Sequence, residues 1–136
     1  MDKSLYQNEL VVTSTVEGFN ECLNVVDKIG KLLNFNFDEN FGLQTVMMES
    51  LENAFIHGNK GIRELEVRVF ISISKSEIFV EIEDAGEGYD FDSILSPIEG
   101  TNNHNESGRG IFFIKSLCSS CYTVGKGNII RIILKR

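Results

Sequence analysis

The sequence predicts an α+β fold, a two-layer sandwich in which helices cover one face of a mixed, largely antiparallel sheet. Two stretches with helical spacing of apolar residues follow each other directly, and strand-like alternation occurs in pairs on either side of a long polar connection. The resulting order, β-α-α-β-β-loop-α-β-β, lacks the strict alternation of a doubly wound parallel sheet. Because the 136 residues contain no repeat and no linker, we expect residues 1–136 to form one domain.

The first strand and the first helix are expected near the N-terminus. Residues 5–13 alternate sufficiently to predict a strand. Ser14 and Glu17 have the spacing of a capping box, which marks the start of a helix. Apolar residues then recur every three or four positions, so the spacing predicts an amphipathic helix over 16–33.

A second helix and two strands are expected next. Asp38 is the expected cap of a helix that runs to about residue 57, where glycines end it. Residues 64–73 and 77–83 then alternate between apolar and polar side chains, and the short serine-containing break between them indicates a hairpin.

The last third of the chain begins with a long polar connection from residue 85 to residue 107. A helix is expected over 108–117. Two final strands, about 121–125 and 129–135, are separated by a Gly-Lys-Gly-Asn turn.

Composition and charge exclude several classes of protein. The net charge of −7 and the pI near 4.8 give no broad cationic surface for a phosphate backbone, so direct nucleic-acid binding is not expected. No apolar run has the length of a membrane span, and three sparse cysteines fit a reducing compartment. We therefore expect a cytoplasmic protein that does not contact the membrane.

The second helix carries Glu49 and Asn53 four residues apart, on the flank of its apolar arc. Their side chains leave the helix on one stripe, about 6 Å apart along the axis. A carboxylate and a carboxamide so placed are able to serve one divalent ion and one reacting hydroxyl. The alternative is a half-exposed polar flank. His57 continues the stripe but is more typical of a helix end, and Glu52 is expected to face solvent.

Asp84 follows the second strand of the central hairpin, and the alternation places it on the same inward face as Ile82. A carboxylate at the end of a buried apolar row is costly unless it accepts hydrogen bonds. The alternative is that Asp84 caps a local turn by accepting from the amide of Gly86. Gly86 and Gly88 lack a Cβ, so the backbone is able to turn sharply and to approach a ligand closely.

Gly108, Arg109 and Gly110 open the helix expected over 108–117. Free amides and the positive end of a helix dipole suit a phosphate, and Arg109 would add a charge-assisted hydrogen bond. The alternative is a flexible entry to an ordinary helix. The polar connection before it, about residues 89–107, is of the long kind that is usually functional, and we expect it to act as a lid.

Together, the three motifs occur in the order and on the elements of the GHKL (Bergerat) ATP-binding fold, which gyrase and histidine kinases share. The chain resembles this superfamily over nearly its whole length. Within it, the run from Glu49 to Gly58 (ESLENAFIHG) and the tail Gly108-Arg109-Gly110-Ile111 are most similar to the stand-alone bacterial anti-sigma factors. These are serine/threonine-protein kinases of the histidine-kinase-like ATPase type.

The resemblance implies ATP and Mg²⁺ as cofactors and gives each motif residue a role. Asn53 would bind the magnesium ion and bridge it to the phosphates of ATP. Glu49 would be the general base that takes a proton from the attacking hydroxyl. Asp84 would accept the amino group of adenine. The glycines and the arginine would line the adenine pocket or fold over the phosphates, namely Gly86 and Gly88 in the pocket and Gly108, Arg109 and Gly110 over the phosphates.

The resemblance also implies partners. The acceptor hydroxyl would belong to a Ser or Thr of a STAS-type anti-sigma factor antagonist, and the kinase, as a homodimer, would sequester a sigma factor. Phosphorylation would release the antagonist, so the sigma factor would stay bound and transcription would stay off. The alternative is a non-catalytic module of another partner-switching pathway that binds ATP to set its shape. The presence of Glu49 favours the kinase.

Two further features remain. Many members of the resembled family have a Thr after the glycine that precedes the last strand, where it bonds the adenine-site Asp, whereas this chain has Gly127-Asn128. An Asn side chain also donates hydrogen bonds. A third hypothesis treats Cys118 and Cys121 as a redox or zinc pair. They lie at the end of the expected helix rather than its start, and no second Cys/His pair accompanies them.

Overall fold

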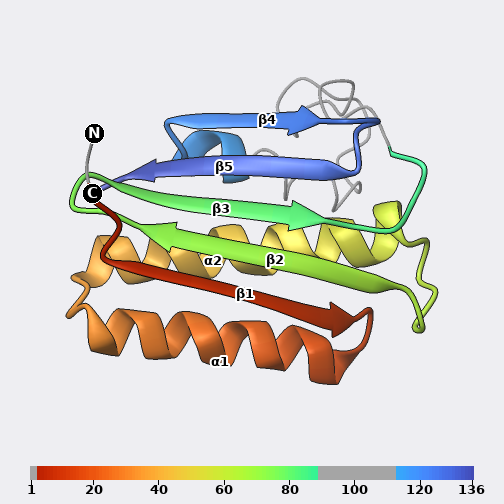
Figure 1. Cartoon of the computed structure of the whole chain (residues 1–136), viewed down its shortest axis with the longest axis horizontal. Coiled ribbons are helices and arrows are strands. Elements are labelled where there is room, and N and C mark those ends of the chain that lie inside the picture. The colour runs from red at the N-terminus through yellow and green to blue at the C-terminus, as the bar shows by residue number, and fades with distance from the viewer. Residues whose placement is uncertain (1–2, 89–112) are drawn as a thin grey trace.

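The computed structural model describes residues 3–88 and 113–136, which contain five strands. These are β1 (Tyr6–Thr13), β2 (Glu66–Ile73), β3 (Glu77–Glu83), β4 (Ser120–Val124) and β5 (Ile129–Lys135). They form one sheet in the order β1-β2-β3-β5-β4 (Figure 1), and every neighbouring pair in it is antiparallel. The predicted α+β class is confirmed, and the pairing is antiparallel throughout the described sheet rather than mixed.

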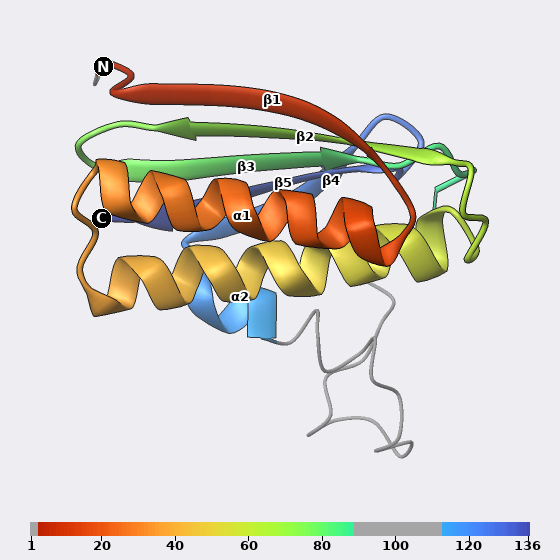
Figure 2. The same ribbon diagram turned by 90° about the horizontal axis from the view of Figure 1, so that it is seen from below.

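Two long helices, α1 (Val16–Leu32) and α2 (Phe37–Asn53), lie side by side on one face of this sheet (Figure 2). The α2 helix continues directly into η1 (Ala54–Gly58), a single π-helical turn. Residues 113–117 are also helical, which agrees with the described part of the helix expected over 108–117. The layered arrangement therefore matches the predicted two-layer sandwich.

The core lies between the sheet and the two helices, because one face of each strand is apolar. On β2 and β3 every second side chain is buried, which is the period of two that predicted these strands. The buried apolar side chains of α2 face them: Leu43, Val46, Met47 and Leu51. Each such side chain contributes about 1.5–3 kcal/mol when it leaves water, so this interface fixes α2 firmly against the centre of the sheet.

The cap of α1 is Thr15 rather than the expected Ser14. The Thr15 hydroxyl accepts from the backbone N–H of Gly18 at 3.0 Å. Ser14 is unable to cap because its own hydroxyl is buried and donates to the carbonyl of Leu65 at 2.8 Å. The strand-to-helix turn therefore begins one residue later than the capping-box spacing predicted.

The cap of α2 is Asn36 rather than the expected Asp38. The Asn36 side chain accepts from the backbone N–H of Glu39, and the Glu39 carboxylate accepts from that of Asn36, at 2.8 and 3.0 Å. Both bonds together form a capping box. Asp38 lies in the first turn, where a negative charge still favours the helix dipole.

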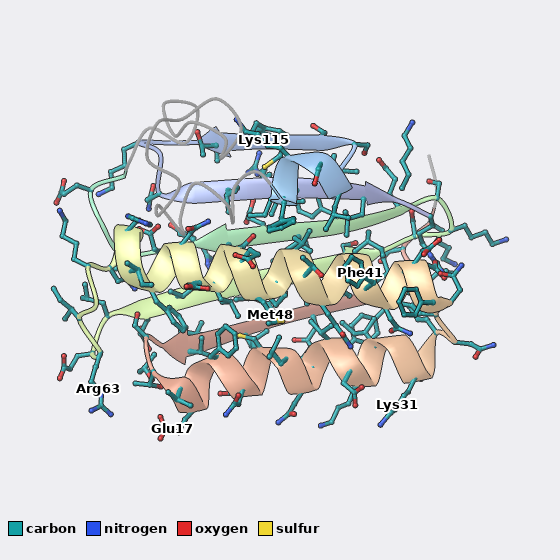
Figure 3. All side chains as sticks on the ribbon, turned by 180° about the vertical axis from the view of Figure 1, so that it is seen from behind. Glu17, Lys31, Phe41, Met48, Arg63 and Lys115 are labelled. Atoms are coloured by element: carbon teal, nitrogen blue, oxygen red, sulfur yellow. The ribbon has the colours of Figure 1, made fainter. Side chains whose placement is uncertain are left out.

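The two outer surfaces differ in character. No described element covers the sheet face that points away from the helices, and ion pairs join its strands, among them Arg131 with Glu81 at 2.6 Å. The outside of the helical layer carries exposed apolar side chains, including Phe41 and Met48 of α2 (Figure 3). No helix among the described residues is long and apolar enough to cross a membrane.

Candidate functional site

The candidate site lies where β3 ends beside the β4–β5 turn, and Asp84 is its central residue. Its side chain is only 6% exposed, which confirms the predicted inward orientation. The Asp84 amide donates to the carbonyl of Asn128 at 2.9 Å, and the Asn128 side-chain amide donates back to the Asp84 carbonyl at 3.0 Å. Asn128 therefore fixes the backbone of Asp84 and leaves its carboxylate to other donors.

The Asp84 carboxylate also caps the turn that follows it. One of its oxygens, Oδ1, accepts from the amide of Gly86 at 2.8 Å. Both predicted features of Asp84 are therefore present: its side chain faces inward, and it caps the turn that follows. Burial raises the pKa of Asp84, and nearby Glu83 adds to the rise, while the Gly86 amide and Lys126 oppose it. A ligand that donates a hydrogen bond would relieve the cost of burying this charge.

Glycines make room for the carboxylate on both sides. A Cβ on Gly58 would lie 2.1 Å from Oδ2 of Asp84, and a Cβ on Gly86 would lie 1.9 Å from the carbonyl oxygen of Gly58. Gly88 has a φ of +91°, and a Cβ there would meet the carbonyl of Lys126 at 1.9 Å. The positive φ of Gly88 agrees with the sharp turn expected of the loop glycines, and their close approach to a ligand stays a prediction.

The π-helical turn η1 brings the end of α2 to this carboxylate. Its signature is the bond from the Asn59 amide to the Ala54 carbonyl, five residues back, at 2.8 Å. Sequence reasoning expected an ordinary helix up to about residue 57. The wider turn places Gly58 directly against Asp84 and turns Asn59 inward.

Asn59 is fully buried and ties together three segments that the sequence keeps far apart. Its carboxamide donates to the Ser14 hydroxyl at 2.9 Å and to the Glu66 carbonyl at 3.1 Å, and it accepts from the Ala85 amide at 2.7 Å. The start of α1, the start of β2 and the end of β3 are thereby joined at the base of the Asp84 turn. The sequence pattern gives Asn59 no role beyond its place just after the expected end of the helix.

Asn53 and Ser50 bring polar side chains from α2 to the same place. Asn53 is 4% exposed and Ser50 is 2% exposed, and neither Nδ2 of Asn53 nor Oγ of Ser50 has a hydrogen-bond partner among the described residues. Glu49 is half-buried and lies one helical turn before Asn53, while Glu52 is exposed as expected. Asn53 is therefore more deeply buried than the predicted polar flank.

Both orphaned atoms belong to residues that line one small pocket. The pocket lies between α2 and the inward face of the sheet at the level of Asp84. Its wall is formed by Ser50, Asn53, Ala54, Ile82, Asp84, Thr123, Gly127, Asn128 and Ile130. Sequence reasoning missed Ser50 and Thr123, although the parity of β4 beside Ile130 would have placed Thr123 on the inward face. A pocket whose buried donors have no partner is suited to a polar ligand.

A model of the histidine kinase-like ATPase domain matches residues 13–134 of the chain. The chain belongs to this family. A comparison with curated proteins found no match. Membership confirms the GHKL resemblance over nearly the whole chain and makes ATP binding its general function.

The hydrogen-bonding groups of the described residues of this histidine kinase-like ATPase domain suit those of an adenine nucleotide. Asp84 offers a buried acceptor for an amino group, and the orphaned Nδ2 of Asn53 offers a donor for a phosphate oxygen. The carbonyl oxygen of an Asn side chain is also a ligand type that Mg²⁺ accepts alongside phosphates. Gly108, Arg109, Gly110 and the lid expected over 89–107 lie outside the described residues.

Cys118 and Cys121 form no disulfide; Cys118 lies just before β4, and Cys121 is the second residue of that strand. Burial raises the pKa of Cys118, and its hydrogen bond with Cys121 only partly opposes this rise. A raised pKa disfavours the thiolate that redox chemistry and zinc binding need. Among the described residues no group of three or more His, Cys, Asp or Glu is placed to hold a metal ion. The geometry therefore weighs against the redox or zinc hypothesis.

Proposed function

We propose that this histidine kinase-like ATPase domain is an anti-sigma factor with serine/threonine-protein kinase activity. It would phosphorylate a STAS-type anti-sigma factor antagonist and would sequester a sigma factor. The observation that carries the proposal is the pair on α2: a half-buried Glu49 stands one turn before a buried Asn53 whose Nδ2 lacks a partner. A module that only bound ATP would need the second residue but not the first.

Two residues would hold the nucleotide. Asp84 would accept from the adenine amino group through the carboxylate oxygen that Gly86 leaves free. Asn53 would donate to a phosphate through Nδ2 and would bind Mg²⁺ through Oδ1. The bound ion would neutralise charge on the phosphates, which is the main requirement of phosphoryl transfer.

Glu49 would act as the general base. Burial raises the pKa of Glu49, and repulsion from Glu52 raises it further. A carboxylate with a raised pKa binds a proton more strongly, so it accepts the proton of a serine or threonine hydroxyl more readily. Its partial exposure leaves it accessible to a hydroxyl that arrives on another protein. Such a base contributes about 10²- to 10⁴-fold to the rate.

The partner assignment is supported by the motif residues. The run from Glu49 to Gly58, which carries the resemblance to anti-sigma factors, forms the last turns of α2 and η1. Asn53 and Gly58, from within that run, contribute the orphaned amide and the close packing against Asp84. Three residues of this run, Ser50, Asn53 and Ala54, line the pocket beside Asp84.

The test is transfer of the γ-phosphate of labelled Mg·ATP to a panel of STAS-domain proteins from the same cell. We expect one of them to be labelled on Ser or Thr and Glu49→Gln to abolish the labelling without loss of ATP binding. Glu52→Gln is the matched control, because Glu52 is exposed on the same helix and off the stripe. ATP binding without transfer to any member of the panel would instead favour the non-catalytic module, and labelling that survives Glu49→Gln would remove Glu49 as the base.

A further inference from the structure

Ser50 has a buried hydroxyl that the proposed mechanism does not use. Its side chain is 2% exposed, and its Oγ has no hydrogen-bond partner among the described residues. Serine hydroxyls within helices usually bond to a backbone carbonyl of the preceding turn or point to water. The Oγ of Ser50 bonds to no backbone carbonyl of the described residues, and a buried hydroxyl without a partner carries a desolvation cost.

The position of Ser50 points to a ligand. Ser50 and Asp84 line the same pocket from opposite layers, Ser50 from α2 and Asp84 from the end of β3. Asn128, the residue expected to bond the Asp84 carboxylate, instead donates to the Asp84 backbone carbonyl. In the described structure the hydroxyl of Ser50 is therefore available as a donor in the pocket that Asp84 also lines.

We propose that Ser50 is a base-recognition residue, whose hydroxyl donates to ring nitrogen N1 of adenine, directly or through one water, while Asp84 accepts from the neighbouring 6-amino group. The inference rests on the proposed nucleotide site and adds a specificity residue to it. Adenine presents an acceptor at N1 next to a donor at its amino group. A hydroxyl and a carboxylate that line one pocket match this pair, because the first is able to donate and the second only accepts.

The same pair disfavours guanine. Guanine has a carbonyl oxygen where adenine has the amino group, so it would place an acceptor against the Asp84 carboxylate. A buried acceptor that faces another acceptor loses the hydrogen bond and keeps the cost of desolvation. Ser50 alone would not discriminate, because a hydroxyl is able to accept from the N1–H of guanine. Ser50 therefore adds affinity for adenine, and Asp84 supplies most of the selection against guanine.

The test is a calorimetric cycle that combines one substitution with two altered nucleotides. Ser50→Ala removes Oγ, and 1-deaza-ATP has a C–H in place of N1. For the wild-type chain we expect 1-deaza-ATP to bind about two- to tenfold more weakly than ATP, the value of one net hydrogen bond. Ser50→Ala should weaken the binding of ATP by a similar factor. The variant should then bind ATP and 1-deaza-ATP with about equal affinity. 7-deaza-ATP is the control nucleotide, because it keeps N1. Ser50→Ala should lower the affinity for 7-deaza-ATP by the same factor as the affinity for ATP.

Ser72→Ala is the matched control variant. Its hydroxyl lies within 3.4 Å of the Ser4 hydroxyl on the opposite side of the molecule, outside the pocket, and all nucleotides should bind it as they bind the wild-type chain. The free Ser50→Ala chain should unfold in urea at the wild-type midpoint or above it, because no described bond is lost. A lower midpoint would mean that Oγ is already bonded, which would overturn the proposal.

Two results separate the failure of this inference from that of the proposed function. If wild-type chain binds ATP but Ser50→Ala leaves the ratio of ATP to 1-deaza-ATP affinity unchanged, Ser50 does not contact N1 and the nucleotide site still stands. If the wild-type chain gives no heat with either Mg·ATP or Mg·ADP, the site itself is wrong and this inference is wrong with it.

Discussion

Replacing Gly58 with alanine would place a methyl group where the Asp84 carboxylate lies. The added Cβ would be 2.1 Å from Oδ2, 2.2 Å from Cγ and 2.7 Å from Oδ1 of Asp84. Gly58 does not have a positive φ, so alanine would be acceptable to the backbone itself. The conflict is therefore with the carboxylate alone, and the carboxylate has to move.

The structure sets the size of the effect. Overpacking a buried site costs about 1–3 kcal/mol. Moving the carboxylate also breaks its bond to the Gly86 amide, a charge-assisted bond worth about 1.5–3 kcal/mol. Alanine recovers about 1 kcal/mol through its higher helix propensity. The free energy of unfolding of Gly58→Ala should therefore fall by about 1.5–5 kcal/mol, and ATP binding should be lost with the displaced carboxylate.

Gly42→Ala is the matched control, because Gly42 is buried within α2 and a Cβ there would meet only Leu134 Cδ1 at 3.8 Å, an ordinary contact. Its free energy of unfolding should stay unchanged or rise by about 1 kcal/mol. Urea unfolding measures both variants, and calorimetry with Mg·ATP measures binding under conditions where each is folded. Wild-type ATP affinity in a folded Gly58→Ala chain would refute the placement of Asp84 in the adenine site.

Three further predictions concern titration and the buried network. Burial raises the pKa of Asp84, so the contribution of its protonated carboxyl group to stability is full below the unfolded-state pKa of about 4 and is lost as pH rises through the folded-state pKa. At pH 7, urea unfolding should therefore show Asp84→Asn to be more stable than the wild-type chain. This variant should not bind ATP. Asn59→Asp loses both donated bonds and should lower the free energy of unfolding by about 2–4 kcal/mol, whereas a change below 0.5 kcal/mol would deny Asn59 its structural role. Because burial raises the pKa of Glu49, the rate of phosphoryl transfer should rise with pH, and the midpoint of that rise should lie above the ordinary pKa of a glutamate; a midpoint at or below the ordinary value would argue against Glu49 as the base.

The fold was largely predictable because the buried face of each strand or helix requires apolar residues at the period of that element. Every second residue of β2 and β3 faces the core, and the helix spacing of α1 and α2 follows from the single face that each buries. The same parity placed Asp84 on the inward face. The helix caps were misplaced by one or two residues, because several neighbouring side chains at each start are chemically able to cap and only the tertiary contacts of Ser14 decide between them at α1.

Site residues were predictable only where a polar side chain stands out against the apolar pattern around it. Glu49, Asn53 and Asp84 stand out as polar residues beside apolar rows. Asn59 does not, because its importance comes from bonds to Ser14, Glu66 and Ala85, whose proximity depends on the complete sheet. A π-helical turn likewise leaves no pattern in composition, since it differs from an α-helix only in which carbonyl each amide reaches.

The π-helical turn η1 makes the position of Gly58 and Asn59 depend on the exact number of residues that precede them. Deleting one residue between Ala54 and Gly58 would restore ordinary α-helical bonding, yet it would rotate the downstream chain by about 100° and shift it by about 1.5 Å. Gly58 would no longer lie against the Asp84 carboxylate, and Asn59 would lose its bonds to the start of α1, the start of β2 and the end of β3. Reporter fusions and engineered insertions therefore belong elsewhere, for example at the exposed Lys75 in the β2–β3 hairpin at the far end of the sheet.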